Sequence, residues 1–154
     1  MSPIPCRRFL QALCLLIGLS PAGAQEVPPE ALQAVGAVGV ADVYMSWMAI
    51  GAVCDAFVHE NEGYDGESVA SILQVMVSLM TAVRESLEAL LAAGGLTDTD
   101  TEVVTLLVQT YEYLALQART FLAYLRTGDP GEYEAHRSHA WGLIERLYGV
   151  SDGE

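Results

Sequence analysis

Lysine is absent from the sequence, and all seven basic residues are arginines. Two of them lie within the first eight residues. The rest of the chain therefore has five basic and twenty acidic residues and a net charge near −15. Nucleic acids and anionic lipids bind protein surfaces that are rich in positive charge. The lack of such charge argues against both as partners and is typical of a protein kept in solution by negative charge.

An apolar run of membrane-spanning length is lacking at the start of the chain. The run at residues 9–19 has about eleven residues, whereas a bilayer span needs about 20. Arg7 and Arg8 precede this run and Ala-Gly-Ala follows it, ending at Ala24, which is the order of a secretory signal peptide. We expect cleavage after Ala24 and a periplasmic or secreted protein in which residues 25–154 form a single helical domain.

Cysteine is scarce, and two of the three cysteines, Cys6 and Cys14, lie in the predicted signal peptide, residues 1–24. Cys54 is then the only cysteine of the exported chain, which excludes an intramolecular disulfide. Because Cys54 belongs to an apolar helical face, we expect a buried, unreactive thiol. The most hydrophobic stretch of the exported chain is interrupted by Asp42 and Asp55, so no transmembrane segment is predicted there.

The alternation of apolar and polar residues that marks strands is missing, whereas four segments have apolar residues at spacings of three and four. Such spacing places these residues on one face of a helix. The first face comprises Val40, Val43, Trp47, Ile50, Cys54 and Phe57. The second comprises Val69, Ile72, Met76, Leu79, Val83 and Leu90, widened by Leu73, Met80 and Leu87. The third comprises Val104, Leu107, Tyr111, Leu114, Ala118, Phe121 and Leu125, and the fourth comprises Tyr133, Ala140, Ile144 and Leu147.

Polar turns separate these segments, with Asp65, Thr99 paired with Glu102, and Asp129 as the expected N-caps. Four amphipathic helices joined by short turns predict an all-α, up-down-up-down four-helix bundle. The fourth helix is the shortest, which leaves apolar surface on its longer neighbours uncovered. Residues 29–41 either extend the first helix or form an extra short N-terminal helix over that surface, unless another chain covers it.

Signatures of catalysis are lacking as well. No glycine-rich oxyanion turn and no positive local field accompany Cys54, so nucleophilic catalysis by its thiol is not expected. The sequence predicts a protein that is not an enzyme and that has no cofactor.

Histidines are few, but Glu132, His136 and His139 recur at helical spacing. Such a set can bind a divalent transition metal, and a solvated helix face explains it equally well. Pairing either histidine with Met45 or Met48 is loosely similar to the Met–His ligation of soluble periplasmic b-type cytochromes, which implies haem as a further alternative. Metal and haem therefore both remain open as cofactors.

The antiparallel order of the bundle predicts one end as the place for any site. Where the first main helix ends and the fourth begins, equal helical rise brings Cys54 level with His136. The candidate binding residues at that end are Cys54, His59, Arg126, Glu132, His136 and His139.

Taken together, the sequence predicts an exported, acidic helical-bundle interaction module, inhibitor- or adaptor-like, that meets a protein partner or a second copy of itself. The alternative is a periplasmic bundle that binds a metal or b-type haem through the histidines near the start of its last helix.

Overall fold

The computed structural model describes residues 29–60 and 64–149. The predicted signal peptide, residues 1–24, lies outside them. The chain divides into two compact units, Met1–Ala34 and Val35–Glu154. The described residues of the first unit are the first turns of helix α2, and the account that follows concerns the second unit.

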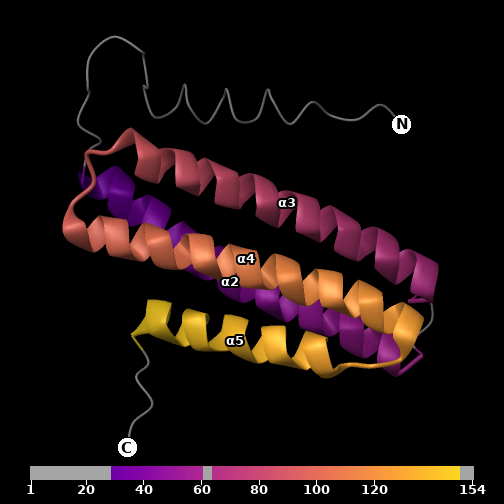
Figure 1. Ribbon diagram of the computed structural model, residues 1–154. Coiled ribbons are helices and arrows are strands. Elements are labelled where there is room, and N and C mark those ends of the chain that lie inside the picture. Colours follow the sequence, from indigo (N-terminus) through magenta and orange to yellow (C-terminus); the bar gives the residue numbers. More distant parts are fainter. Residues whose placement is uncertain (1–28, 61–63, 150–154) are drawn as a thin grey trace, which may run out of the picture. The chain divides into compact units, whose positions relative to one another are not determined.

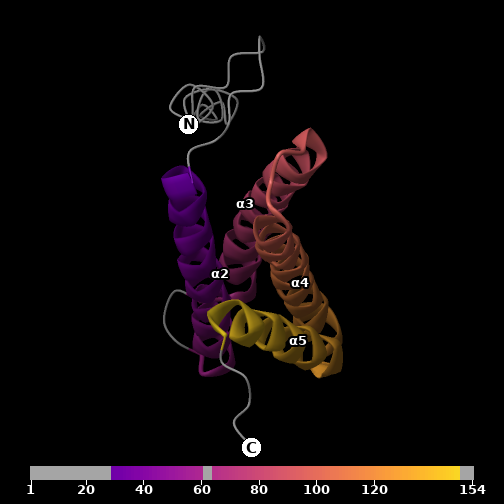
Figure 2. The same cartoon turned by 90° about the vertical axis from the view of Figure 1, so that its left-hand side faces the viewer.

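Four helices make up the described chain: α2 (Pro29–Val58), α3 (Gly66–Ala93), α4 (Asp98–Thr127) and α5 (Gly131–Tyr148). Residues 64–149 and the turn after α2 contain no strand. Consecutive helices run in opposite directions (Figure 1), and Figure 2 shows the same four helices turned by 90°. The predicted all-α four-helix bundle is confirmed. Residues 29–41 belong to α2, so they form the first part of a long helix and not a separate short one.

The helix N-termini show which polar residues act as N-caps. Asp65 caps α3 as predicted, because its side chain accepts a hydrogen bond from the backbone N–H of Ser68 at 2.8 Å. The prediction for α4 is wrong by two residues, because Thr97 and not Thr99 is the N-cap. The Thr97 hydroxyl accepts from the backbone N–H of Asp100 at 3.1 Å and donates to its carboxylate at 2.7 Å. The Thr-Asp repeat offers this cap chemistry twice, and the earlier start adds helical hydrogen bonds.

Helix α5 is short and begins after a tight turn. The carboxylate of Asp129 accepts from the backbone N–H of Gly131 at 3.0 Å, while Pro130 occupies the N-cap position that was predicted for Asp129. The helix has 18 residues, against 28 in α3 and 30 in each of α2 and α4. The predicted shortness of the last helix is therefore confirmed.

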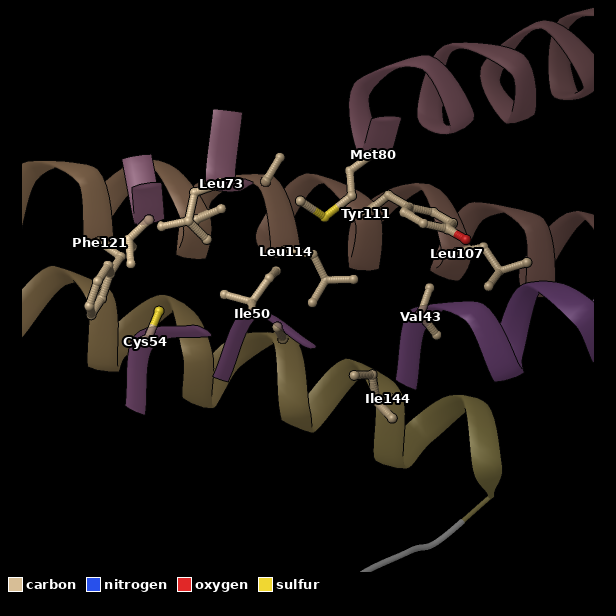
Figure 3. Packing of buried hydrophobic residues seen from close by; sticks show 14 residues of the cluster. Val43, Ile50, Cys54, Leu73, Met80, Leu107, Tyr111, Leu114, Phe121 and Ile144 are labelled. Carbon is tan, nitrogen blue, oxygen red and sulfur yellow. The ribbon is translucent and has the colours of Figure 1, made fainter. Parts of the chain in front are cut away.

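All four helices contribute to one hydrophobic core (Figure 3). Helix α4 packs against both α3 and α5 and supplies the largest share of buried side chains. The core comprises Val43, Ile50 and Cys54 of α2, Val69, Leu73 and Met80 of α3, Leu107, Tyr111, Leu114, Ala115, Ala118 and Phe121 of α4, and Ala140 and Ile144 of α5. The faces predicted for the first, third and fourth helices are confirmed.

The face predicted for α3 is rotated from the one that is buried. Leu73 and Met80, expected at its edge, lie in the core, whereas Ile72, Leu79 and Val83 are exposed. The reason is that α3 is apolar around more than half of its circumference, so the spacing of its apolar residues does not single out the side that meets α4.

Helices α2 and α4 touch directly. The Tyr111 hydroxyl donates a hydrogen bond to the Asp42 carboxylate at 2.5 Å. A Cβ atom added at Gly39 would lie 2.9 Å from a methyl carbon of Leu107, so a glycine at this position permits the close approach. Asp42, which interrupts the hydrophobic stretch of α2, thus fixes α2 against α4.

Candidate functional site

Helices α2 and α5 lie side by side in opposite directions, and aromatic contacts set their register. The rings of Tyr44 and Tyr148 are 6.1 Å apart between centroids, and those of Trp47 and Trp141 are 4.7 Å apart. The indole N–H of Trp47 donates to the carbonyl oxygen of Arg137 at 3.3 Å. This register brings the end of α2 beside the start of α5, where the sequence predicted a site.

The α5 residues next to Cys54 are Tyr133 and Arg137. With Gln117 of α4 they form a group that we call the buried polar cluster: Cys54, Gln117, Tyr133 and Arg137. The Tyr133 hydroxyl lies beside both the Cys54 thiol and the Gln117 amide. Gln117 is fully buried, and neither its amide nitrogen nor its amide oxygen has a hydrogen-bond partner among the described residues.

The thiol and the phenol of the buried polar cluster are neutral groups. Burial raises the pKa of the Cys54 thiol to about 12 and that of the Tyr133 hydroxyl also to about 12. Both groups therefore stay protonated near neutral pH. A thiolate nucleophile is not available in this setting, and the prediction of a buried, free cysteine is confirmed.

We expect the Cys54 thiol to react with an aromatic disulfide reagent at pH 8 at least about 100-fold more slowly in the folded protein than in urea. With a pKa of about 12, about one thiol in ten thousand is ionised at that pH. The measurement uses a chain with Cys6→Ser and Cys14→Ser, so that only Cys54 reports. Equal rates in buffer and in urea would contradict the burial of this thiol.

The raised pKa of the Cys54 thiol also makes the stability of the fold depend on pH. The folded chain keeps the Cys54 proton between about pH 9 and pH 12, where the unfolded chain loses it, since the ordinary value is 9.0. The folded state therefore loses stability as pH rises through this range.

The other predicted binding residues do not gather around Cys54 in the contacts that the structure shows. His136 and His139 face Tyr113 of α4, with ring centroids 5.9 and 3.9 Å apart, and the closer pair is stacked. His59 is exposed, with its Nδ1 2.8 Å from the carbonyl oxygen of Asp55. Arg126 and Glu132 are exposed as well.

Metal and haem binding gain no support from these positions. Within residues 29–60 and 64–149, no three His, Cys, Asp or Glu side chains are grouped so that they could hold a metal ion. Met45 and Met48, the methionines considered as haem ligands, are 63% and 45% exposed on α2. Metal and haem stay alternatives that rest on the sequence alone.

Three residues that the structure makes prominent were not predicted from the sequence: Tyr113, Gln117 and Arg137. Gln117 follows Leu114 by three positions and precedes Phe121 by four, so its spacing is that of a core residue despite its polarity. Arg137 lies four residues after Tyr133 and four before Trp141, which is the same signal. The guanidinium of Arg137 covers the Trp47 ring at 4.0 Å from its centroid, and this use of its charge could not be read from spacing.

Two helices are apolar well beyond what the core uses. The segments Gly36–Val58 and Gly66–Ala93 are long and apolar enough, by length and composition, to cross a membrane, yet 22% and 17% of their most apolar windows are buried. Part of that apolar character faces outward, because several large apolar side chains of both helices are exposed. The core does not account for this exposed apolar surface. It does not account either for an aromatic cleft between α2 and α5, which is lined by Tyr44, Trp141, Ile144, Glu145 and Tyr148.

Comparison with protein families, with characterised proteins and with solved structures finds no match to this chain.

Proposed function

We propose that this protein is an exported interaction module that binds another protein chain through an apolar surface on α3. The observation that carries the proposal is a row of four large apolar side chains spaced by three and four residues. We call it the α3 stripe: Ile72, Val75, Leu79 and Val83, which are 37–58% exposed.

The α3 stripe has the dimensions of a helix-packing surface. From Ile72 to Val83 it rises about 16 Å at 1.5 Å per residue, which is three turns of one ridge that can pack into the groove of a partner helix. Burying a large aliphatic side chain contributes about 1.5–3 kcal/mol. Contiguous exposed apolar surface of this kind marks interaction sites on soluble proteins.

Helix α2 adds apolar surface that can adapt to a partner. Val38, Met45 and Met48 are 45–68% exposed, and methionine side chains fit irregular surfaces because they are unbranched and polarisable. The chain carries a net charge of −13. A partner with basic residues around its apolar contact would therefore associate faster than a neutral one.

Export is proposed from the sequence order of Arg7, Arg8, the apolar run and Ala24. The state of Cys54 is compatible with an oxidising compartment, because the thiolate is the form that is oxidised and burial keeps this thiol protonated. A periplasmic or secreted location follows for the interaction module.

Site-specific photo-crosslinking in the native host tests the proposal. With p-benzoylphenylalanine in place of Leu79, we expect a covalent adduct with a protein, either a second copy of the chain or a different one. The matched control places the same residue at Gln74, which is exposed on the same helix away from the α3 stripe. Mass spectrometry of the adduct identifies the partner.

A strong adduct at position 79 and little at position 74 supports the proposal. Equal labelling at both positions, or none at position 79, overturns it. Flotation of the purified protein with lipid vesicles, together with lipid adducts and no protein adduct at position 79, would also overturn it by assigning the α3 stripe to a membrane surface.

A further inference from the structure

The cleft between α2 and α5 has an aromatic lining that the proposed interaction surface does not use. It has a volume of about 300 Å³ and is lined by Tyr44 of α2 and by Trp141, Ile144, Glu145 and Tyr148 of α5. This volume is at the lower end of ligand pockets in proteins, about 300–1,000 Å³. The cleft therefore admits a small ligand.

Its three aromatic rings are set at angles to one another. The ring of Tyr44 makes an interplanar angle of 53° with Trp141 at a centroid distance of 6.3 Å, and of 80° with Tyr148 at 6.1 Å. Rings that are tilted or perpendicular to each other present π faces from different directions. Such faces attract a cation through their quadrupoles, and several together form the aromatic cages that hold alkylated ammonium groups.

The same row of rings already holds one cation of this chain. Trp141 packs on Trp47 at 4.7 Å, and the guanidinium of Arg137 covers the opposite part of the row at 4.0 Å from the Trp47 centroid. Arg137 thus occupies the Trp47 end of the row. Tyr44, Trp141 and Tyr148, at the other end, line the cleft.

The one charged side chain in the lining of the cleft is negative. That residue is Glu145, and the only ion pair among the described residues joins Arg84 and Glu88 elsewhere. A cation in the cleft would therefore gain attraction from a carboxylate that no neighbouring basic group neutralises by direct pairing. An anion near the cleft would be repelled by the charge of Glu145.

The geometry points to a binding site for a small methylated ammonium ion in this cleft, with Tyr44, Trp141 and Tyr148 around the cation and Glu145 as the counter-charge. The site is independent of the α3 stripe. Its ligand is recognised by charge and by methyl groups that pack on the rings, so a neutral molecule of the same shape binds more weakly.

A titration with choline and with 3,3-dimethylbutan-1-ol, its uncharged isostere, tests this assignment. Binding is followed through tryptophan fluorescence and by calorimetry, on the full chain. We expect choline to bind with a dissociation constant on the order of 1–10 mM and the isostere at least about tenfold more weakly. Glu145→Gln and Tyr148→Ala should each weaken choline binding about fivefold or more, and Tyr64→Ala, an exposed tyrosine outside the cleft, should leave it unchanged.

Equal binding of choline and its isostere would overturn the proposal, because the cleft would then be a plain apolar site. Absence of saturable binding up to 100 mM choline, a concentration about tenfold above the expected constant, would also overturn it, as would wild-type affinity in both Glu145→Gln and Tyr148→Ala. Glu145→Gln changes no packing volume, so it decides the case if Tyr148→Ala alters the end of α5.

Phosphatidylcholine vesicles identify the source of the ammonium group. Choline binding without retention on the vesicles assigns the cleft to a free solute. Retention that choline competes away, and that Glu145→Gln removes, assigns it to a lipid headgroup. Each of these results supports the cation site, and retention that Glu145→Gln leaves intact would count against it.

Discussion

Replacing Phe121 with alanine is expected to lower the free energy of unfolding by about 3–5 kcal/mol, the range for aromatic truncations in protein cores. Phe121 is among the largest fully buried side chains of α4. Its ring lies edge-on to Phe57 of α2, with centroids 6.1 Å apart, and to Tyr133 of α5 at 5.0 Å. One side chain thus joins three helices, so its removal leaves a cavity that no single helix can close.

Urea denaturation followed by circular dichroism measures this loss for Phe121→Ala. Tyr64→Ala serves as the control, since Tyr64 is exposed and surface substitutions usually change stability by less than about 0.5 kcal/mol. A Phe121→Ala protein that loses less than about 1 kcal/mol would show that the three helices do not share this contact.

Trp47→Ala is expected to have a comparable effect, a loss of about 3–5 kcal/mol, although Trp47 is only half-buried. Its ring packs at a tilt against Trp141 and lies under the guanidinium of Arg137, and its N–H donates to the carbonyl oxygen of Arg137. Removing the Trp47 ring also removes the aromatic face that the Arg137 guanidinium contacts. One terminal nitrogen of Arg137 is already buried with no hydrogen bond among the described residues. A buried, unpaired charged group adds to the cost of the lost packing.

Thermal and urea unfolding of Trp47→Ala and Trp47→Phe separate these contributions. Trp47→Phe keeps an aromatic face for Arg137 and Trp141 but removes the N–H, so we expect it to lose less than half as much stability as Trp47→Ala. If both variants lost the same amount of stability, the hydrogen bond would be the main contribution and the aromatic contacts a minor one.

The sequence alone determined the number of helices, their order and three of the four buried faces. Helices α4 and α5 have apolar residues at helical spacing next to polar ones, so one face of each is distinguished by hydrophobicity. Helix α2 is apolar beyond its buried face, with Val38, Met45 and Met48 exposed, yet the residues predicted for its core face do pack there. The cap at Asp65 was predictable too, because a carboxylate directly before a helical segment can accept a hydrogen bond from a free N–H of the first turn. The approximate register of α2 against α5 followed from equal rise in antiparallel helices of a bundle.

The meeting of the end of α2 with the start of α5 was predictable, but the residues that meet there were not. The start of α5 does lie beside the end of α2, but the residues there are Tyr133 and Arg137, while His136 and His139 turn to Tyr113 of α4. Successive residues of an α-helix point about 100° apart around its axis. A prediction based only on the height of residues along the helix axes can therefore name side chains that point elsewhere. Gln117 was missed because a polar residue at core spacing is read as a surface residue.

Only the tertiary structure decided which side of α3 is buried. Ile72 and Leu79 were expected inside and are exposed, whereas Leu73 and Met80 lie in the core. The spacing of apolar residues does not predict which of several equally apolar sides is buried. That side is set by the surface of α4, against which α3 packs. The apolar surface left on α3 and the aromatic cleft between α2 and α5 both arise in this way, because they depend on the rotation of one helix against its neighbours and not on the periodicity of any one helix.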